Sequence, residues 1–171
     1  MKAGIGLITE DRRGNGIFGC LSIKDNVGVS IYNKYLKGGF VLDHKKINNV
    51  VDDSIKKLRI KTPNMQEHIA NLSGGNQQKV IVARWLANDP DILIMDEPTR
   101  GIDVGAKHEI YEIMNDLAAE GKAIIMVSSE MAELLGMSDR VYVMCNGKMR
   151  GEITEVAEMT QEHVMAYATK F

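Results

Sequence analysis

Two adjacent carboxylates, Asp96 and Glu97, directly follow the apolar run at 92–95. A short apolar run of this kind predicts a buried strand, so both carboxylates are expected at a strand end. A rigid strand end can hold one carboxylate at a fixed distance from a hydrated Mg²⁺, while the next residue faces the water that attacks a γ-phosphate. Asp96 is therefore the candidate metal ligand and Glu97 the candidate general base. Taken alone, such a pair more often marks only a strand that meets a polar turn.

A second candidate site is formed by Ser73, Gly74 and Gly75, at the start of a helix predicted over 74–87. Free backbone amides and the helix dipole favour an anion there, and glycines let a phosphate approach the backbone. A plain N-cap would explain Ser73, but it would not explain two consecutive glycines in the first turn, where glycine is unfavourable. Phosphate binding is the interpretation that explains all three residues.

Three segments in order, LSGGNQQK at 72–79, DEPTRGIDVGAK at 96–107 and SSEMAELLGMSDR at 128–140, resemble conserved regions of ABC ATPases. They correspond to the signature, to Walker B with the D-loop, and to the switch region. With Asn76 where many relatives have glutamine, and TEDRR at 9–13, the chain is similar to the second ATP-binding half of ribose and galactoside importers. The resemblance covers essentially the whole chain. It implies an α/β fold: a partial P-loop NTPase-like parallel sheet with an ABC-type helical subdomain.

In this family two halves enclose ATP head to tail, so the resemblance implies a site that is shared with a partner half. The implied nucleotide ligands are Ser73, Gly74, Gly75, Asn76 and Asp103. The implied Mg²⁺ ligands are Asp96 and Glu10. The implied partners are ATP, the first ATP-binding half of the same transporter, membrane permease subunits and, indirectly, a sugar-binding protein outside the membrane. The implied location is the cytoplasmic face of a bacterial plasma membrane.

Three departures from the family pattern bear on catalysis. No GxxxxGK[ST] loop occurs in the sequence, so we expect the chain to be part of a longer protein and to bind and hydrolyse ATP poorly alone. Ser129 stands at the switch position, where most relatives place a histidine that contacts the γ-phosphate. Glu10 or Asp11 replaces a glutamine that usually faces Mg²⁺ and water. Two readings therefore stay open: an ATPase with Glu97 as base, and a non-hydrolysing half that only completes the partner's ATP site.

Composition argues against several other classes of protein. With 171 residues, 44% of them hydrophobic, the chain can fill the core of one ordinary domain. Its 21 basic and 23 acidic residues create no field that would attract nucleic acid. Cys20 and Cys145 lie far apart, which argues against a zinc site and against a disulfide-stapled secreted domain. The glycines at 14, 16 and 19 spell GxGxxG, but the residues that follow do not predict the long helix that a dinucleotide site needs.

The elements that must position these residues follow from periodicity and turn residues. Helices are predicted over 43–60, 74–87, 103–120 and 129–135, and strands over 4–9, 92–95, 123–127, 140–145 and 148–153. The helix over 103–120 is expected to bury Val104, Tyr111, Met114 and Leu117. Residues 10–88 are expected to hold helices and loops without strands, and the later alternation predicts a parallel sheet covered on its faces.

The predicted parts are a core strand at 1–9, a helical and signature subdomain at 10–89, the Walker B, D-loop and switch part at 90–155, and a C-terminal helix at 156–171. Because the first βα unit of the family is missing from the sequence, we expect the sheet to expose an edge and apolar surface. Such a surface predicts dimerisation or strand exchange.

Overall fold

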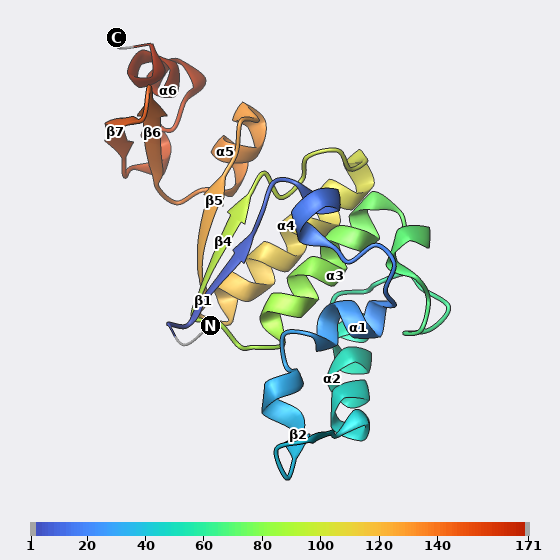
Figure 1. Ribbon diagram of the computed structural model, residues 1–171. Helices are drawn as coiled ribbons and strands as arrows, with labels where there is room; N and C mark the ends of the chain where they lie inside the picture. The colour runs from blue at the N-terminus through green and yellow to red at the C-terminus, as the bar shows by residue number, and fades with distance from the viewer. Residues whose placement is uncertain (1–2, 170–171) are drawn as a thin grey trace. The chain divides into compact units, whose positions relative to one another are not determined.

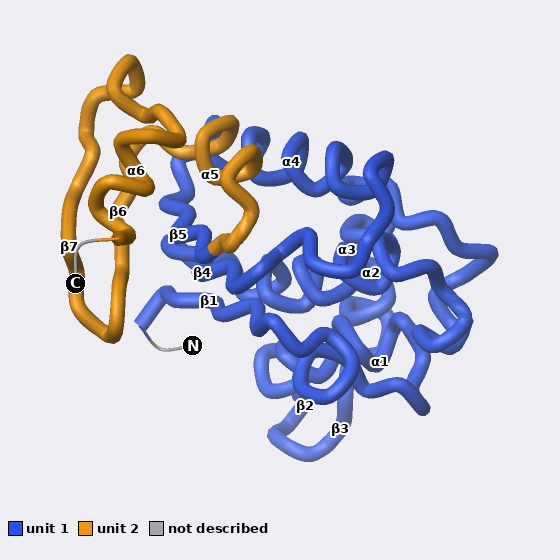
Figure 2. The backbone as a smooth tube through the Cα atoms, turned by 90° about the horizontal axis from the view of Figure 1, so that it is seen from above, with its two compact units in different colours: residues 1–127 blue, residues 128–171 orange. Residues whose placement is uncertain are grey.

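The computed structural model describes residues 3–169 and forms two compact units, which divide between residues 127 and 128 (Figure 2). The first unit contains a parallel sheet and most of the helices, and the second contains a hairpin with two helices. None of the described helices is long and apolar enough to cross a membrane. The predicted α/β class with a parallel sheet is confirmed.

The sheet of the first unit is three-stranded and parallel, in the order β1 (Ile5–Ile8), β4 (Ile92–Asp96), β5 (Ala123–Val127) (Figure 1). One face of the sheet carries Ile8, Leu93 and Met95, which are almost fully buried. Helix α3 (Gly74–Leu86) contacts β1, and helix α4 (Val104–Ala119) contacts β5. The core of this unit therefore lies between these helices and one face of the sheet.

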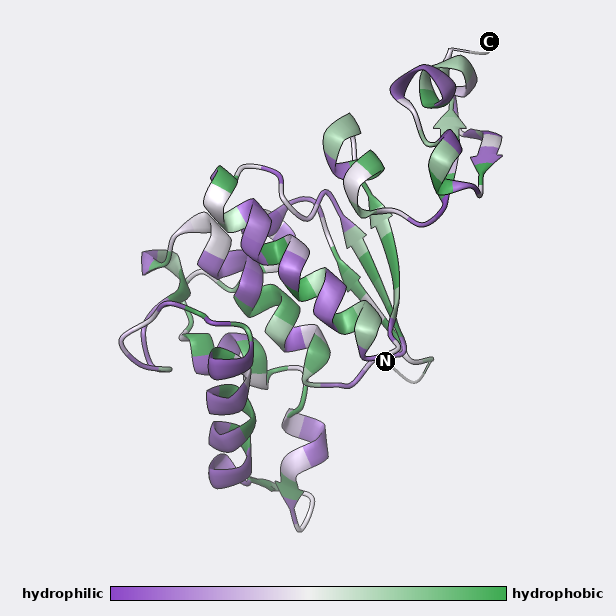
Figure 3. Ribbon diagram, turned by 180° about the vertical axis from the view of Figure 1, so that it is seen from behind, coloured by the Kyte–Doolittle hydropathy of each residue, from purple (hydrophilic) through white to green (hydrophobic). Residues whose placement is uncertain are grey.

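The opposite face of the sheet is largely exposed. Ile5 and Leu7 of β1 are 42% and 44% exposed, and Ile125 and Val127 of β5 are 52% and 50% exposed. Figure 3 shows these strands as hydrophobic along their length. The prediction of a sheet covered on both faces was wrong, whereas the expectation of exposed apolar surface is confirmed. Strand alternation places every second residue on the open face, so the strands are apolar on both sides although only one side is packed.

The helical part between β1 and β4 contains more structure than predicted. The elements before α3 are η1 (Arg12–Gly16), α1 (Ile23–Gly28), η2 (Tyr32–Tyr35), β2 (Leu36–Lys37), β3 (Val41–Leu42), α2 (His44–Lys57) and η3 (Ile69–Asn71). The expectation that residues 10–88 contain no strand was wrong, because β2 and β3 pair across Gly38 and Gly39, both at positive φ. Strands of two residues are too short for periodicity to reveal. Helix α2 begins as predicted, since the Asp43 carboxylate accepts a hydrogen bond from the amide of Lys46 at 3.3 Å.

Helix α4 begins at its predicted cap, where Asp103 accepts a hydrogen bond from the amide of Ala106 at 2.9 Å. Its buried stripe differs from the predicted one and consists of Ile110, Ile113, Met114 and Leu117. Val104 was wrongly assigned to the core, because it is 83% exposed in the first turn. Tyr111 is only half-buried. The buried apolar stripe therefore starts about one and a half turns into the helix.

The second unit consists of α5 (Met131–Met137), an antiparallel pair β6 (Val141–Cys145) and β7 (Lys148–Ile153), η4 (Val156–Glu158) and α6 (Gln161–Ala168). Asn146 and Gly147, between the two predicted strands, both have positive φ, as a tight two-residue hairpin turn requires. Its core contains Val141, Val143, Ile153, Met159 and Val164. The C-terminal helix begins later than the predicted residue 156, because Thr160 caps it by accepting a hydrogen bond from the amide of His163. Residues 170 and 171 of that prediction lie outside the described part.

Candidate functional site

Asp96 is the last residue of β4, and Glu97 begins the turn that leaves the sheet. Strand alternation places Asp96 on the same, open face as Ile94, and both side chains are half-buried. Glu97 has a φ of +47°, an unusual conformation for a residue with a side chain, and its amide donates to the carbonyl of Val127 at 2.8 Å. The sharp turn follows directly, and the neighbouring Thr99 is buried. The predicted strand end with two carboxylates is therefore present.

The donor set at this strand end fits Mg²⁺ held largely by a nucleotide. Mg²⁺ in such sites takes one or two protein carboxylates and completes its shell with water and phosphate oxygens. Asp96 offers one half-buried carboxylate, and within residues 3–169 no group of three or more His, Cys, Asp or Glu side chains is placed to hold a metal ion. The described residues thus form no metal site made of protein ligands alone. The geometry is compatible with a site in which Asp96 is one ligand and the nucleotide and water supply the others.

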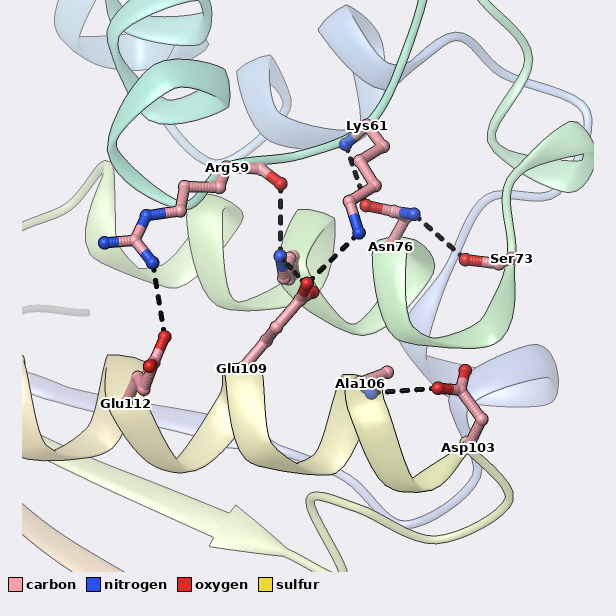
Figure 4. A network of polar contacts seen from close by, with 9 residues as sticks. Arg59, Lys61, Ser73, Asn76, Asp103, Ala106, Glu109 and Glu112 are labelled. Carbon is pink, nitrogen blue, oxygen red and sulfur yellow. Dashed lines mark hydrogen bonds and ion pairs between the residues drawn. The ribbon is translucent and has the colours of Figure 1, made fainter.

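Ser73 occupies the predicted N-cap position of α3, with φ −60° and ψ 157°. Its hydroxyl makes no capping hydrogen bond to the helix. Instead, the side-chain amide of Asn76 donates to the hydroxyl oxygen of Ser73 at 2.9 Å (Figure 4). The amides at the start of α3 therefore keep their donors directed out of the helix, the arrangement in which a helix N-terminus binds an anion.

The two signature glycines meet different surroundings. A Cβ on Gly75 would lie 2.4 Å from the Cβ of Ala106, in the first turn of α4. A Cβ on Gly74 would lie 3.0 Å from Nη2 of Arg12 and 3.4 Å from the carbonyl oxygen of Gly101. Gly75 is thus required by helix packing, independently of any phosphate. Gly74 faces the loop that follows β1 and the loop that precedes α4.

Arg12 and Arg100 join those two loops beside Gly74. Arg12 donates to the carbonyl of Arg100 at 3.4 Å, and Glu10 forms an ion pair with the Arg100 side chain. Burial lowers the pKa of the Arg12 guanidinium, and the neighbouring charge of Arg13 lowers it further. The positive charge of Arg12 adds to the positive end of α3, which favours an anion at this place. Glu10 is held by Arg100 here, and its role as a Mg²⁺ ligand stays a prediction.

A buried ion pair lies behind the signature and was missed at the sequence level. Lys79 of α3 is 1% exposed, and its ammonium lies 2.7 Å from the Glu109 carboxylate of α4. Lys61 contacts the other oxygen of Glu109 at 3.1 Å. Hydrogen bonds from Lys79, which has the larger effect, and from Lys61 hold the pKa of Glu109 below its ordinary value. The only sequence signal was a lysine directly before the apolar run at 80–83 of this helix.

Arg84 is a second buried cation that the sequence analysis missed. Its guanidinium donates to the carbonyls of Gly16 and Asn26 at 2.7 and 2.6 Å and to the Asn26 side chain at 2.7 Å, and it lies 5.0 Å from the ring centre of Phe18. Burial lowers the pKa of Arg84 to about 10. Arg84 thereby ties Gly16, the last residue of η1, and Asn26, in α1, to α3.

Ser129, the residue at the predicted switch position, lies in the second unit, directly before the N-cap residue Glu130 of α5. The hydroxyl of the neighbouring Ser128 donates to Glu133 at 2.5 Å, and Glu133 is 3% exposed. The switch segment is thus ordered by its own side chains. The role of Ser129 toward a nucleotide stays a prediction.

Comparison with known proteins agrees with this geometry. Residues 1–100 match the ABC transporter family. Over 170 residues, 99% of the chain, it is 56% identical to the galactose/methyl galactoside import ATP-binding protein MglA of Clostridium tetani (strain Massachusetts / E88) and covers 34% of that protein. Over 169 residues it is 54% identical to a putative ribose/galactose/methyl galactoside import ATP-binding protein of Geobacillus kaustophilus (strain HTA426), of which it covers 33%.

Among solved structures, cbiO1 from Clostridium perfringens, part of the ABC transporter complex cbiONQ, is similar in fold. The TM-score is 0.75 at 24% identity, with 96% of this chain and 62% of that chain covered. The chain spans about a third of the length of the curated relatives it matches. The family match over more than half of the sequence, together with a signature helix and a strand ending in two carboxylates, means that the chain belongs to the ABC transporter family.

Proposed function

We propose that this chain is the signature- and Walker B-bearing part of the second ATP-binding half of a sugar importer of the ribose or galactoside type. The observation that carries the proposal is the start of α3, where Ser73 leaves the helix amides uncapped, Gly74 faces the neighbouring loops and Gly75 packs against α4. Support for the substrate class comes from the relatives, whose names specify import of galactose, methyl galactoside or ribose. ATP binding and Mg²⁺ are part of this proposal.

In the proposed site, the Ser73 hydroxyl and the amides at the start of α3 donate hydrogen bonds to the γ-phosphate of ATP held by the first half. Asp103 caps α4, whose first turn packs against Gly75 of the signature, and it is proposed to lie beside the bound nucleotide. Asn76 and Gly74 complete the predicted nucleotide-binding set. Donors of this kind stabilise the charge that develops on the phosphate oxygens, and removal of one typically lowers turnover by about 10²–10³-fold.

At the second proposed site, Asp96 holds Mg²⁺, which neutralises phosphate charge when it is bound. Glu97 accepts a proton from the water that attacks the γ-phosphorus, and ADP leaves with the electron pair of the broken bond. Ser129 stands at the switch position, where most members of the family have a histidine. Glu10, after β1, stands where they have a glutamine. An alternative is therefore that this half binds nucleotide without hydrolysing it and only completes the partner's ATP site.

The proposed partners are the first ATP-binding half, two membrane permease subunits and, indirectly, a sugar-binding protein outside the membrane. The proposed location is the cytoplasmic face of a bacterial plasma membrane, where the permease would hold the chain. The predicted division into a strand at 1–9, a helical subdomain at 10–89, a Walker B part at 90–155 and a C-terminal part from 156, whose helix begins at Gln161, belongs to this proposal. The isolated chain is proposed to be inactive, because its sequence contains no Walker A loop.

Two substitutions in the intact transporter test the proposal. Ser73→Arg fills the anion site with a long side chain, so ATP turnover is expected to fall at least about a hundredfold. Asn71→Arg adds the same side chain two residues earlier, at an exposed position, and should leave turnover nearly unchanged. Glu97→Gln separates the two readings: lost turnover supports the enzyme, and retained turnover supports the non-hydrolysing half. Unchanged turnover with Ser73→Arg would contradict the proposal itself.

Calorimetry of the chain with Mg²⁺ and ATP gives a second test. No binding is expected for the chain alone, whereas a mixture with a matching first ATP-binding half should retain ATP more tightly than that half alone. The gain should disappear with Ser73→Arg and persist with Asn71→Arg. ATP turnover by the chain alone would contradict the proposed absence of activity.

A further inference from the structure

The segment at 57–61 joins α2 to the extended chain before the signature, and it is fixed to both α3 and α4. Arg59 has a φ of +51°, and its carbonyl accepts a hydrogen bond from the buried ammonium of Lys79 at 3.1 Å. The Arg59 side chain pairs with Glu112 of α4 at 3.2 Å, and Lys57 pairs with Glu120 at 2.7 Å. Residues of α3 and of α4 with its C-terminal cap therefore hold this short segment, and Figure 4 shows the contacts of Arg59.

Asn76 connects the same segment to the signature serine. Its side-chain oxygen accepts a hydrogen bond from the backbone amide of Lys61 at 2.8 Å, and its side-chain nitrogen donates to the Ser73 hydroxyl at 2.9 Å. The two bonds fix which end of the amide faces which partner, because only the oxygen can accept from a backbone N–H. They also leave the Ser73 hydroxyl with its own proton to donate.

Glu109 completes the connection on α4. One oxygen of its carboxylate contacts Lys61 and the other contacts Lys79, so a single side chain joins the segment at 57–61 to the signature helix. Glu109 lies in the same helix whose first turn packs against Gly75 through Ala106. The first two turns of α4 thus contact α3 on either side of Asn76. Rotation of Asn76 away from Ser73 would break its bond to Lys61 and disturb this arrangement.

We infer that Asn76 is a positioning residue, which holds the Ser73 hydroxyl ready to donate to phosphate and links it through Lys61 to Glu109 and Lys79. This inference rests on the proposed function of Ser73. It assigns to Asn76 an indirect role, in place of the direct nucleotide contact expected from the resemblance. A hydroxyl that accepts one hydrogen bond is also a stronger donor of another, so the Asn76 amide strengthens as well as orients the contact.

A double-mutant cycle on ATP affinity in the intact protein tests the inference. If Asn76 acts only through Ser73, Asn76→Ala should weaken ATP affinity about tenfold in the wild-type background, the effect of one good hydrogen bond. In the Ser73→Ala background the same substitution should change affinity by less than about twofold. Asn71→Ala, an exposed asparagine whose amide donates to Glu67, is the matched control and should leave affinity unchanged.

The outcomes separate the inference from the function on which it rests. Equal loss of affinity on Asn76→Ala in both backgrounds would mean direct contact with nucleotide and would overturn the inference. An unaltered affinity with Asn76→Ala would also overturn it. If Ser73→Ala itself has no effect, the proposed function of the signature fails instead, whatever the result at Asn76.

Amide hydrogen exchange on the chain supplies a readout without nucleotide. Exchange at the Lys61 amide should accelerate at least about tenfold in Asn76→Ala, because its acceptor is removed. In Asn76→Asp the acceptor remains and Lys61 should stay protected. The carboxylate, however, accepts the Ser73 proton and donates nothing, so ATP affinity should fall at least as far as with alanine. Wild-type ATP affinity in Asn76→Asp would contradict the proposed direction of the Ser73 hydrogen bond.

Discussion

At the scale of single residues, Gly75 explains why the signature needs small side chains even before a ligand is considered. The first turns of α3 and α4 approach so closely that a Cβ on Gly75 would lie 2.4 Å from the Cβ of Ala106, far inside van der Waals contact. Both atoms belong to short side chains that cannot rotate away. The backbone of one helix would therefore have to move, and the loops at either end of the proposed site would move with it.

Gly75→Ala is accordingly expected to lower the free energy of unfolding by about 1–3 kcal/mol, as for overpacking elsewhere. Urea unfolding of the chain measures the change. Ala106→Gly alone should cost about 1 kcal/mol through lost helix propensity. In the double variant the clash is gone. Its loss of unfolding free energy should therefore be smaller than the sum of the two single losses by about 1 kcal/mol or more. Simple additivity would show that the two Cβ positions do not compete.

At the scale of elements, the predictions from sequence succeeded where a long pattern or a strong cap was present. Helix α2 has a capping Asp43, and β5 has five consecutive apolar residues, so their positions were predicted closely. The β2–β3 hairpin and α1 were missed, because elements of two and six residues carry too little periodicity. The candidate site was predicted as a set of residues. Its internal contacts, above all those of Asn76 and Glu109, depend on tertiary distances that no sequence pattern specifies.

The contact of α4 with α3 and the segment at 57–61 predicts a pH dependence of stability. Hydrogen bonds from Lys79 and Lys61 lower the pKa of Glu109 from an ordinary value of 4.5. A carboxyl group whose pKa is lowered in the folded state contributes its full stabilisation when the pH is above its pKa in the unfolded state. This contribution is lost as the pH falls through the folded-state pKa. The contribution of Glu109 should therefore be complete above about pH 5 and should disappear on further acidification.

Glu109→Gln removes this contribution and leaves Lys79, which is 1% exposed, without its carboxylate. The free energy of unfolding near pH 7 should fall by about 1–3 kcal/mol, less than for a fully buried pair, because the Glu109 side chain is 34% exposed. The variant should also lose less stability than the wild type between pH 5 and pH 3. Glu112→Gln, which affects the exposed pair with Arg59 and the exposed contact with His108, should change stability by less than about 1 kcal/mol. Parallel stability curves for wild type and Glu109→Gln would contradict the assignment.

At the scale of the whole molecule, the open face of the parallel sheet exposes apolar side chains from both of its edge strands. Ile5, Leu7, Ile125 and Val127 each expose about half of their side chains on that face. Contiguous apolar surface of this kind usually marks a place where another surface binds. When the purified chain is alone in solution, the only protein that can cover this face is a second copy of the same chain.

Self-association that increases with concentration is therefore expected and can be measured by sedimentation equilibrium. Leu7→Thr together with Ile125→Thr keeps residues that suit strands but removes much of the apolar surface, so the dimer dissociation constant should rise about tenfold or more. Phe40→Thr is the matched control: Phe40 is 94% exposed but lies in the turn between β2 and β3, away from the sheet. A chain that stays monomeric at high concentration would contradict the prediction. Association that only the Phe40 variant weakens would move the contact from the sheet to the β2–β3 hairpin.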